Sequence, residues 1–155
     1  MRKIEQIKEI VDLWENSLLA SEKKYIHYRS ITNFIFHFEN LPNIRIKETA
    51  ALLLSNYIDE VENNNFDFKG KRSYELAKKY MNEISEIYKS NLGFKSFIDL
   101  RFIILFPILG DGILYFFLKN KPHLYIPIIS LCLFTYYLYT KIFFEKRKIV
   151  YGIFY

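Results

Sequence analysis

The chain has 155 residues, a length that suits one domain or one small domain with an appendage. Its 15 Phe and 13 Tyr residues exceed what the interior of a small soluble domain readily buries, so the composition argues against a simple soluble fold and favours contact with a bilayer. Residues 1–100 hold 15 basic and 15 acidic side chains, so the net charge of +5 arises in residues 101–155, beside the apolar runs, where it predicts membrane-flanking charge and no nucleic-acid partner.

The cysteine content and the first residues narrow the possibilities further. Cys132 is the only cysteine, so the chain cannot form an internal disulfide, and one thiol does not make a metal site. Residues 1–10 read MRKIEQIKEI, in which charges recur too often for the apolar core of a signal peptide. We therefore expect the N-terminal part to remain on the cytoplasmic side of the membrane, where it is made.

The first two predicted elements are amphipathic helices. In the first, apolar residues recur at intervals of three and four between charged ones, as in a helix with one buried stripe. That stripe comprises Ile4, Ile7, Val11, Trp14 and Leu18. A second helix is predicted at about 22–40, and it should stop before Pro42 because proline disfavours helix in the residue ahead of it.

Two further helices complete the predicted N-terminal module. The third, at about 46–62, has the widest apolar face, and its acidic group is expected to be solvated rather than to bind a cation. That group comprises Asp59, Glu60 and Glu62. Ser73 is predicted to cap the fourth helix, and Gly93 is expected to end it in the left-handed conformation. No alternating strand pattern is present, so residues 1–93 are predicted to form an all-α bundle of about four helices.

The C-terminal part, residues 94–155, is predicted to contain a hairpin of two transmembrane helices at about 102–118 and 124–140. Each run has 17 residues, and Asp111 is the only charge within them. Such a run spans about 25 Å, slightly less than a hydrocarbon core of about 30 Å, and flanking cations can extend outward to cover the difference. The alternative is a pair of buried helices in a soluble protein, but the cations and tyrosines near the ends of both runs favour the membrane.

The cations also predict the orientation of the hairpin. Its outer ends carry six cationic side chains and its central turn carries two, so the positive-inside rule places both termini in the cytoplasm. The six are Lys95, Arg101, Lys141, Lys146, Arg147 and Lys148, and the two are Lys119 and Lys121. The expected location is the inner membrane of a bacterium.

Short segments flank the two runs. Residues 94–99 are predicted to form an interfacial elbow, with Phe94, Phe97 and Ile98 on its apolar side and Lys95 and Asp99 on its polar side. The tail, residues 149–155, is too short to span a bilayer and is interpreted as an interfacial anchor. The alternative is a docking peptide for a partner or for the chain's own bundle.

Motifs that would indicate catalysis or a cofactor are missing from the sequence. The only histidines are His27, His37 and His123, and no Glu-x-x-His pair accompanies them, so no metal site is expected. The glycine-rich phosphate loops and the nucleophile elbow are absent as well. We therefore expect a protein that is not an enzyme and that has no cofactor.

Asp111 is the one residue whose position is unusual. It is the tenth of 17 residues in the first run, where an ionised carboxylate is costly, and Gly110 and Gly112 would let a second helix approach it closely. In an antiparallel hairpin the same depth on the second run falls near Ser130 and Thr135. These five residues form the predicted intramembrane polar contact, with a structural role favoured over an ion or proton path.

The sequence resembles no family that we recognise, so its function is inferred from architecture alone. The favoured hypothesis is a non-enzymatic membrane protein in which a hairpin anchors a helical interaction module for a protein partner or a further copy of the chain. One alternative is an oligomer that permeabilises the membrane, assembled around Asp111. Another is an immunity protein that neutralises a membrane toxin. Both alternatives rest on analogy of layout.

Overall fold

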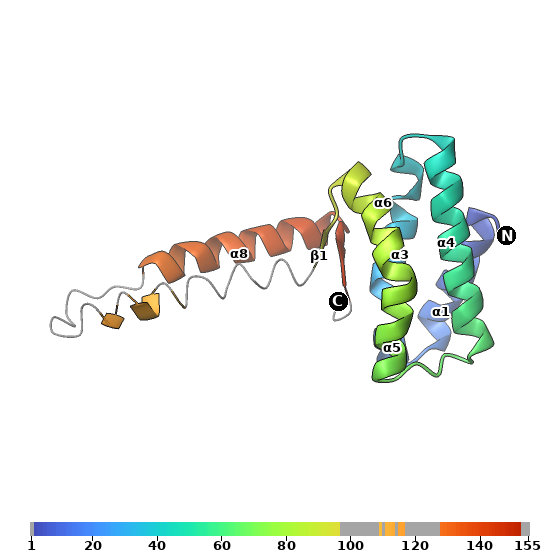
Figure 1. The fold of residues 1–155 in the computed structure, drawn as a ribbon, viewed down its shortest axis with the longest axis horizontal. Helices are drawn as coiled ribbons and strands as arrows, with labels where there is room; N and C mark the ends of the chain where they lie inside the picture. The colour runs from blue at the N-terminus through green and yellow to red at the C-terminus, as the bar shows by residue number, and fades with distance from the viewer. Residues whose placement is uncertain (1, 97–108, 110, 114, 117–127, 153–155) are drawn as a thin grey trace. The chain divides into compact units, whose positions relative to one another are not determined.

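A computed structural model describes residues 2–96, 109, 111–113, 115–116 and 128–152 (Figure 1). These residues belong to two compact units, one made of Met1–Lys95 with Lys148–Tyr155 and the other of Ser96–Arg147. Most of the described elements are helices, so the predicted all-α class is confirmed. Each unit is treated separately below.

The first helix, α1 (Ile4–Ser17), follows the predicted stripe. Its side chains Ile4, Ile7, Val11 and Trp14 are buried, while the charged residues between them face outward. The ring of Trp14 packs edge-on against Phe66, with 5.3 Å between the ring centroids. At its start the backbone amide of Lys3 donates to the Gln6 side chain at 3.0 Å, which holds the first turn closed.

The predicted second helix is interrupted at His27, so the expectation of one helix over 22–40 was wrong. The chain forms α2 (Ala20–Tyr25) and α3 (Tyr28–Phe36), followed by a short 3₁₀ helix, η1 (Phe38–Asn40). His27 lies between α2 and α3 with φ of 53°, in the left-handed region. Neither glycine nor proline marks this break in the sequence, and contacts from a distant part of the chain stabilise it.

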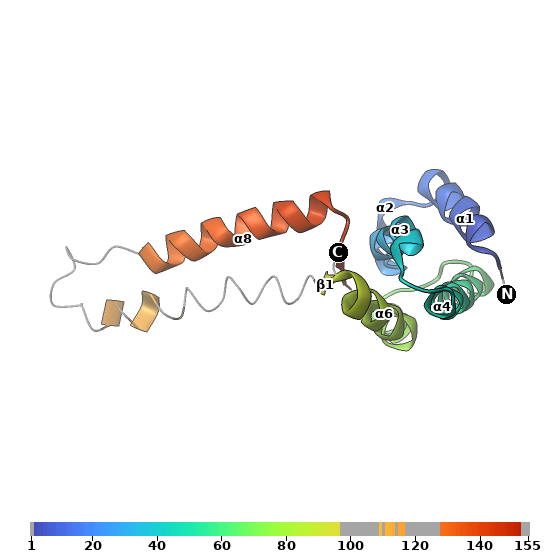
Figure 2. The same ribbon diagram turned by 90° about the horizontal axis from the view of Figure 1, so that it is seen from above.

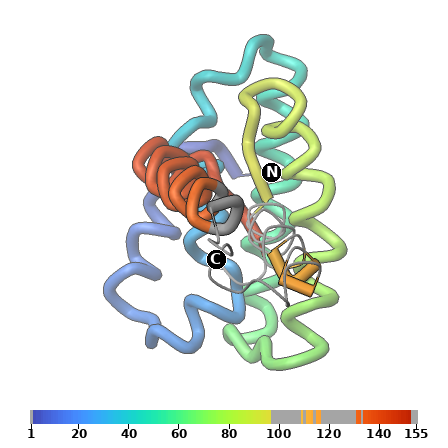
Figure 3. Tube along the Cα trace, turned by 90° about the vertical axis from the view of Figure 1, so that its left-hand side faces the viewer, coloured from blue at the N-terminus to red at the C-terminus, as the bar shows by residue number. Residues whose placement is uncertain are grey.

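Helix α4 (Ile44–Asn63) is the longest element of the first unit. The side chain of Asn43 accepts the backbone amide of Ile46 at 2.9 Å and so caps the first turn. Leu54, Tyr57 and Ile58 are fully buried, in agreement with the wide apolar face predicted for this helix. The helix packs beside α6 (Asn82–Leu92), as Figures 1 and 3 show, and it also contacts α1.

The predicted fourth helix consists of three pieces. Helix α5 (Lys71–Leu76) leads through a π-helical turn, η2 (Ala77–Met81), into α6. Gly93 ends α6 with φ of 69°, so the predicted left-handed stop is confirmed. Ser73 is not the N-cap, because Gly70 holds that position and the Ser73 hydroxyl donates to the carbonyl of Tyr25 at 2.6 Å.

Two short strands, which the sequence did not predict, join the two ends of the first unit. Strand β1 (Lys95–Ser96) pairs with β2 (Val150–Tyr151), and the amide of Lys95 donates to the carbonyl of Ile149 at 3.0 Å. The Asn33 side chain donates to the carbonyl of Val150 at 2.8 Å, and the amide of Gly152 donates to the Ser30 hydroxyl at 3.1 Å. The β1–β2 sheet therefore fastens the end of the chain to α3.

An aromatic cluster lies beneath this sheet. Phe34 stacks on Phe94 with 5.3 Å between centroids, and Tyr88 and Tyr151 lie at 4.7 and 5.9 Å from the same ring. Phe94 and Val150 are both fully buried. The interfacial position predicted for Phe94 was therefore wrong, while Phe97, Ile98 and Asp99 lie outside the described residues.

The tail packs on the bundle through Ile149 and Tyr151, and the carbonyl of Val150 accepts from Asn33. Of the two interpretations given for this segment, docking on the chain's own bundle is the one that these contacts support. Figure 2 shows the same ribbon from above, with α4 seen nearly end-on.

The second unit contains α8 (Ile128–Lys146) and short helical pieces at residue 109, 111–113 and 115–116. Most of the predicted first span, 102–118, and the start of the second, 124–140, lie outside the described residues. Among the helices that can be described, none is both long and apolar enough to traverse a bilayer. The transmembrane hairpin is therefore not shown by the structure and stays a prediction.

A fragment of residues 1–93 lacks the core residue Phe94 and the fully buried Val150, so it should be much less stable than a bundle that keeps the sheet. The matched comparison is residues 1–96 joined by a Gly/Ser linker to residues 147–155. Losing two buried side chains of this size lowers the free energy of unfolding by about 4 kcal/mol. Urea unfolding followed by circular dichroism measures the difference, and equal midpoints for the two proteins would show that the sheet contributes nothing to the core.

Candidate functional site

A groove of about 440 Å³ runs between α1 and α3 in the first unit. Its floor is apolar, since Val11 and Ile35 are buried, and its walls carry the aromatic rings of Tyr28 and Phe36. The remaining lining residues are polar or charged: Lys8, Asp12, Glu15, Thr32 and Lys148. Helical periodicity explains the lining, because residues 8, 11, 12 and 15 share one face of α1.

The charges of the groove are separated along its length. The negative charges of Glu15 and Asp12 help to raise the pKa of Tyr28, so these carboxylates lie toward the start of α3. At the end of α3, the Lys148 ammonium lies 4.2 Å from the centroid of the Phe36 ring. Lys8 lies toward the same end as Lys148, because its positive charge, together with the larger effect of Lys47, lowers the pKa of Glu39, which follows α3 in the chain. The groove therefore has an acidic end and a basic end with an apolar floor between them.

These four charged side chains take part in none of the ion pairs found among the described residues. Lys23 lies near the acidic end, 5.6 Å over the Tyr28 ring, but its ammonium donates to the backbone carbonyl of Glu15 at 2.5 Å. The Glu15 carboxylate is therefore left facing solvent. An arrangement of this kind can bind a surface that carries matching charges on an apolar ridge.

Burial, together with the charges of Glu15 and Asp12, raises the pKa of the Tyr28 hydroxyl to about 12. The cause is direct: ionised phenol would add a third negative charge beside two carboxylates in a partly desolvated site. Tyr28 consequently stays neutral at physiological pH and offers an O–H donor within an apolar wall. It is not a general base in this state.

A second polar group, formed by His27, Ser73 and Tyr57, lies in the interior. His27 Nε2 lies 3.0 Å from the carbonyl oxygen of Ser73, and a carbonyl only accepts, so this nitrogen carries the proton. It therefore cannot take a proton from the Ser73 hydroxyl, which itself donates to Tyr25. Tyr57 donates to the carbonyl of Ile26. These side chains donate hydrogen bonds to the backbone carbonyls of Ser73, Ile26 and Tyr25, and so they hold α5 next to the break between α2 and α3. The role of the group is therefore structural.

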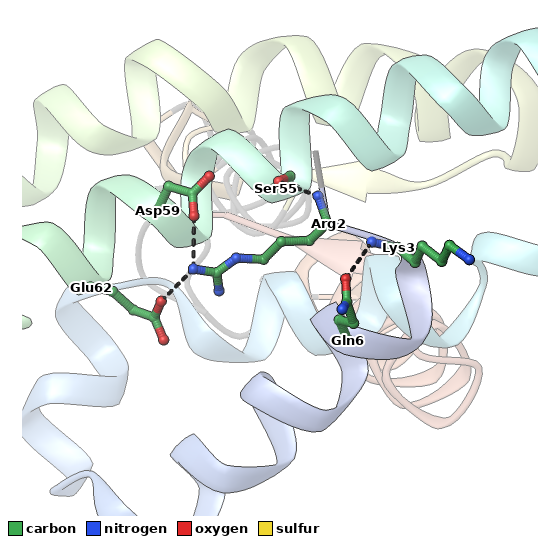
Figure 4. A network of polar contacts seen from close by, with 6 residues as sticks. All are labelled: Arg2, Lys3, Gln6, Ser55, Asp59 and Glu62. Atoms are coloured by element: carbon green, nitrogen blue, oxygen red, sulfur yellow. Dashed lines mark hydrogen bonds and ion pairs between the residues drawn. The ribbon is translucent and has the colours of Figure 1, made fainter.

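The acidic group of α4 is engaged by cations of the chain itself, as Figure 4 shows for Asp59 and Glu62. The Arg2 guanidinium lies 2.8 Å from Asp59 and 2.7 Å from Glu62, and the Arg2 amide donates to the hydroxyl of Ser55 at 3.1 Å. These carboxylates are partly exposed, as predicted for a solvated face, but the prediction did not include their pairing with the N-terminus. The pairing fixes the start of α1 on α4.

The third carboxylate of this group, Glu60, is held by side chains of η2. Lys79 donates to it at 2.7 Å and Tyr80 at 3.1 Å, and the Lys79 contact lowers the pKa of Glu60 while Glu60 raises the pKa of Lys79. In the part of the chain that the structure describes, no group of three or more His, Cys, Asp or Glu side chains is placed to hold a metal ion. The carboxylates of α4 thus serve packing between helices.

The predicted polar contact of the second unit is described only in part. Asp111 is 4% exposed, and it interacts with another group of the chain. Thr135 is exposed, and its hydroxyl donates to the carbonyl of Leu131 at 2.8 Å. Gly112 leaves open space where a side chain would start, while Gly110 and the side chain of Ser130 lie outside the described residues. The contact among these residues stays a prediction.

The sequence did not single out the groove. Lys8, Asp12 and Glu15 were interpreted only as the solvated side of the first helix, and Tyr28 and Phe36 lie on a helix whose start was misplaced. A signal did exist, because the three charges and Val11 fall at helical spacing with opposite signs at the two ends. The position of Lys148 in the groove has no local signal, because it depends on the return of the tail.

Comparison with protein-family models, with curated proteins and with solved structures finds no match for this chain.

The raised pKa of Tyr28 gives a direct test of the groove's acidic end. In the full chain, the Tyr28 ring should titrate near pH 12, against an ordinary value of 10.0, and Asp12→Asn with Glu15→Gln should lower that pKa. Because the folded pKa is the higher one, Tyr28 favours the folded state fully below pH 10.0, and this contribution is lost as the pH rises toward 12. NMR of ring-labelled tyrosine measures the titration, and Tyr28→Phe assigns the signal. Titration of Tyr28 near pH 10 in the unmodified chain would contradict the geometry.

Proposed function

We propose that this chain is a non-enzymatic integral membrane protein in which a hairpin of two helices, at about 102–118 and 124–140, anchors a helical interaction module. The observation that carries the proposal is the surface of the second unit. Its described residues include ten large apolar or aromatic side chains that are exposed. They are Leu109, Ile113, Tyr115, Phe116, Leu131, Phe134, Tyr136, Leu138, Tyr139 and Ile142. So much exposed apolar surface is unfavourable in water and requires an apolar environment.

The β1–β2 sheet supports an even number of membrane crossings. Lys95 and Ile149 are joined by a backbone hydrogen bond of 3.0 Å, so the two ends of the segment between them lie side by side. A segment whose two ends meet on one side of a bilayer crosses it twice or not at all. This geometry agrees with the cation bias that assigns both termini to the cytoplasm, in the inner membrane of a bacterium.

Within the hairpin, we assign Asp111 to a polar contact with Gly110, Gly112, Ser130 and Thr135. Its burial supports this assignment, because a carboxyl group in an apolar environment requires a polar partner or neutralisation. The same burial favours a second candidate function, an oligomer that permeabilises the membrane around Asp111. Under the first proposal the hairpin is an anchor, and under the second it lines a conducting path.

Membrane extraction tests the anchor. The full chain should remain in the membrane pellet after washing with alkaline carbonate, because its apolar helices are embedded in lipid. A matched variant in which a Gly/Ser linker replaces residues 97–147 keeps the β1–β2 sheet and should be released into the supernatant.

Recovery of the full chain in the supernatant would overturn the proposed function. A membrane-potential dye, added during induced expression of the same chain, separates the two candidates: an anchor leaves the potential unchanged, whereas a pore collapses it. Asp111→Asn should abolish that collapse if the second candidate holds.

A further inference from the structure

We propose that the groove between α1 and α3 is the contact between two copies of this chain, related by a two-fold axis. This inference rests on the proposed function in one respect: it takes the first unit to be an interaction module, and it identifies the partner as a second copy. The argument depends on the distribution of charge along the groove and on one exposed aromatic ring at its rim.

The charges of the groove complement themselves under a two-fold rotation. Asp12 and Glu15 lie at one end, and Lys8 and Lys148 lie at the other, so turning a second copy by 180° places each acidic end opposite a basic end. Lys8 and Glu15 are seven residues apart on α1, which separates them by about 10 Å along the helix axis. The groove has no net charge, so two copies face each other without overall repulsion.

Phe36 supplies a projection that suits the groove of the other copy. Its side chain is 60% exposed on the rim, and the Lys148 ammonium covers the ring at 4.2 Å. An aromatic ring that carries a cation fits a hollow with an apolar floor and carboxylates at its rim. The acidic end of the groove has these features, with the buried Val11 in the floor and the Glu15 carboxylate close enough to act electrostatically on Tyr28.

The acidic end is available to a second copy because its carboxylates are not neutralised within the chain. On α4, by contrast, Asp59, Glu60 and Glu62 are each paired with an arginine or lysine of the same chain at 2.8 Å or less. Lys23, the cation nearest to the acidic end, donates to a backbone carbonyl of α1. An incoming Lys148 therefore meets carboxylates that have no ion-pair partner among the described residues.

Charge reversal on the full chain tests the contact. Lys8→Glu leaves three acidic side chains against one basic one in the groove, and Glu15→Lys leaves three basic side chains against one acidic one. Each variant should therefore weaken self-association about tenfold or more through like-charge repulsion between positions 8 and 15. Mixed together, the two variants should associate at least as tightly as the unmodified chain, because position 8 of each copy then faces a side chain of opposite sign at position 15 of the other. Light scattering in one detergent throughout gives the mass of each sample, and differently tagged copies report mixed dimers.

Exposed charges outside the groove provide the matched controls. Lys78→Glu and Glu83→Lys make the same changes in net charge on α5–α6 and should leave self-association unchanged, and circular dichroism checks that all four variants fold. The proposal is wrong if the unmodified chain is monomeric at the highest concentration reached. It is equally wrong if the groove variants dimerise like the controls, or if mixing them restores no association. Carbonate extraction does not depend on dimerisation, so the two proposals can fail independently. A monomeric full chain leaves the anchoring proposal standing, and a full chain that carbonate releases from the membrane can still be tested for dimerisation.

Discussion

The buried side chain of Val150 is the constraint on which the rest of the structure depends. It comes from the last described strand, yet it is fully buried, and its neighbours Ile149 and Tyr151 pack against the core formed by the first 94 residues. Its backbone carbonyl accepts from Asn33, and the neighbouring carbonyl of Ile149 accepts from Lys95. The chain must therefore close a loop of about fifty residues, and the entropy of that closure is offset by burial and by backbone hydrogen bonds.

Several features of the first unit follow from this return. The buried polar side chains of Ser30 and Asn33 on α3 would be costly in an apolar core, but they receive the backbone of the tail. The same return brings Lys148, in the left-handed conformation with φ of 56°, to the rim of the groove above Phe36. Of the two cations at the basic end of the groove, Lys8 belongs to α1, whereas Lys148 is present only while the tail is docked. The two ends of the apolar unit are also held together, which is the geometric basis for assigning them to one side of a membrane.

The charged residues divide into those that stabilise the bundle and those that remain available. Arg2 and Lys79 neutralise the carboxylates of α4 and tie the start of α1 and η2 to it, as partly exposed ion pairs of modest strength. The groove charges are separated along α1 and α3 instead of being paired. This difference explains why a chain with balanced charge over its first hundred residues still presents a dipolar surface.

The sequence predicts those parts of the fold that depend on local periodicity. The stripe of α1, the wide apolar face of α4 and the left-handed Gly93 all follow from spacing and from the conformational freedom of glycine, and the structure confirms them. The break at His27 was not predictable, because a non-glycine residue adopts positive φ there through bonds to Ser73, 46 positions away. The β1–β2 sheet and Lys148 in the groove were missed for the same reason, since their partners are distant in sequence.

Hydrogen exchange at two backbone amides tests the return of the tail most directly. The amide of Lys95 donates to Ile149, and the amide of Gly152 donates to the hydroxyl of Ser30, so both should exchange far more slowly than free amides in the full chain. Replacing Asn33 with alanine removes the bond to Val150 and should speed the exchange of both. Exchange of Lys95 and Gly152 at the rate of unstructured peptide, with α4 still protected, would show that the tail does not dock. Lys148 would then have no fixed place in the groove, and the proposal that both ends of the hairpin lie on one side of a membrane would lose its structural basis.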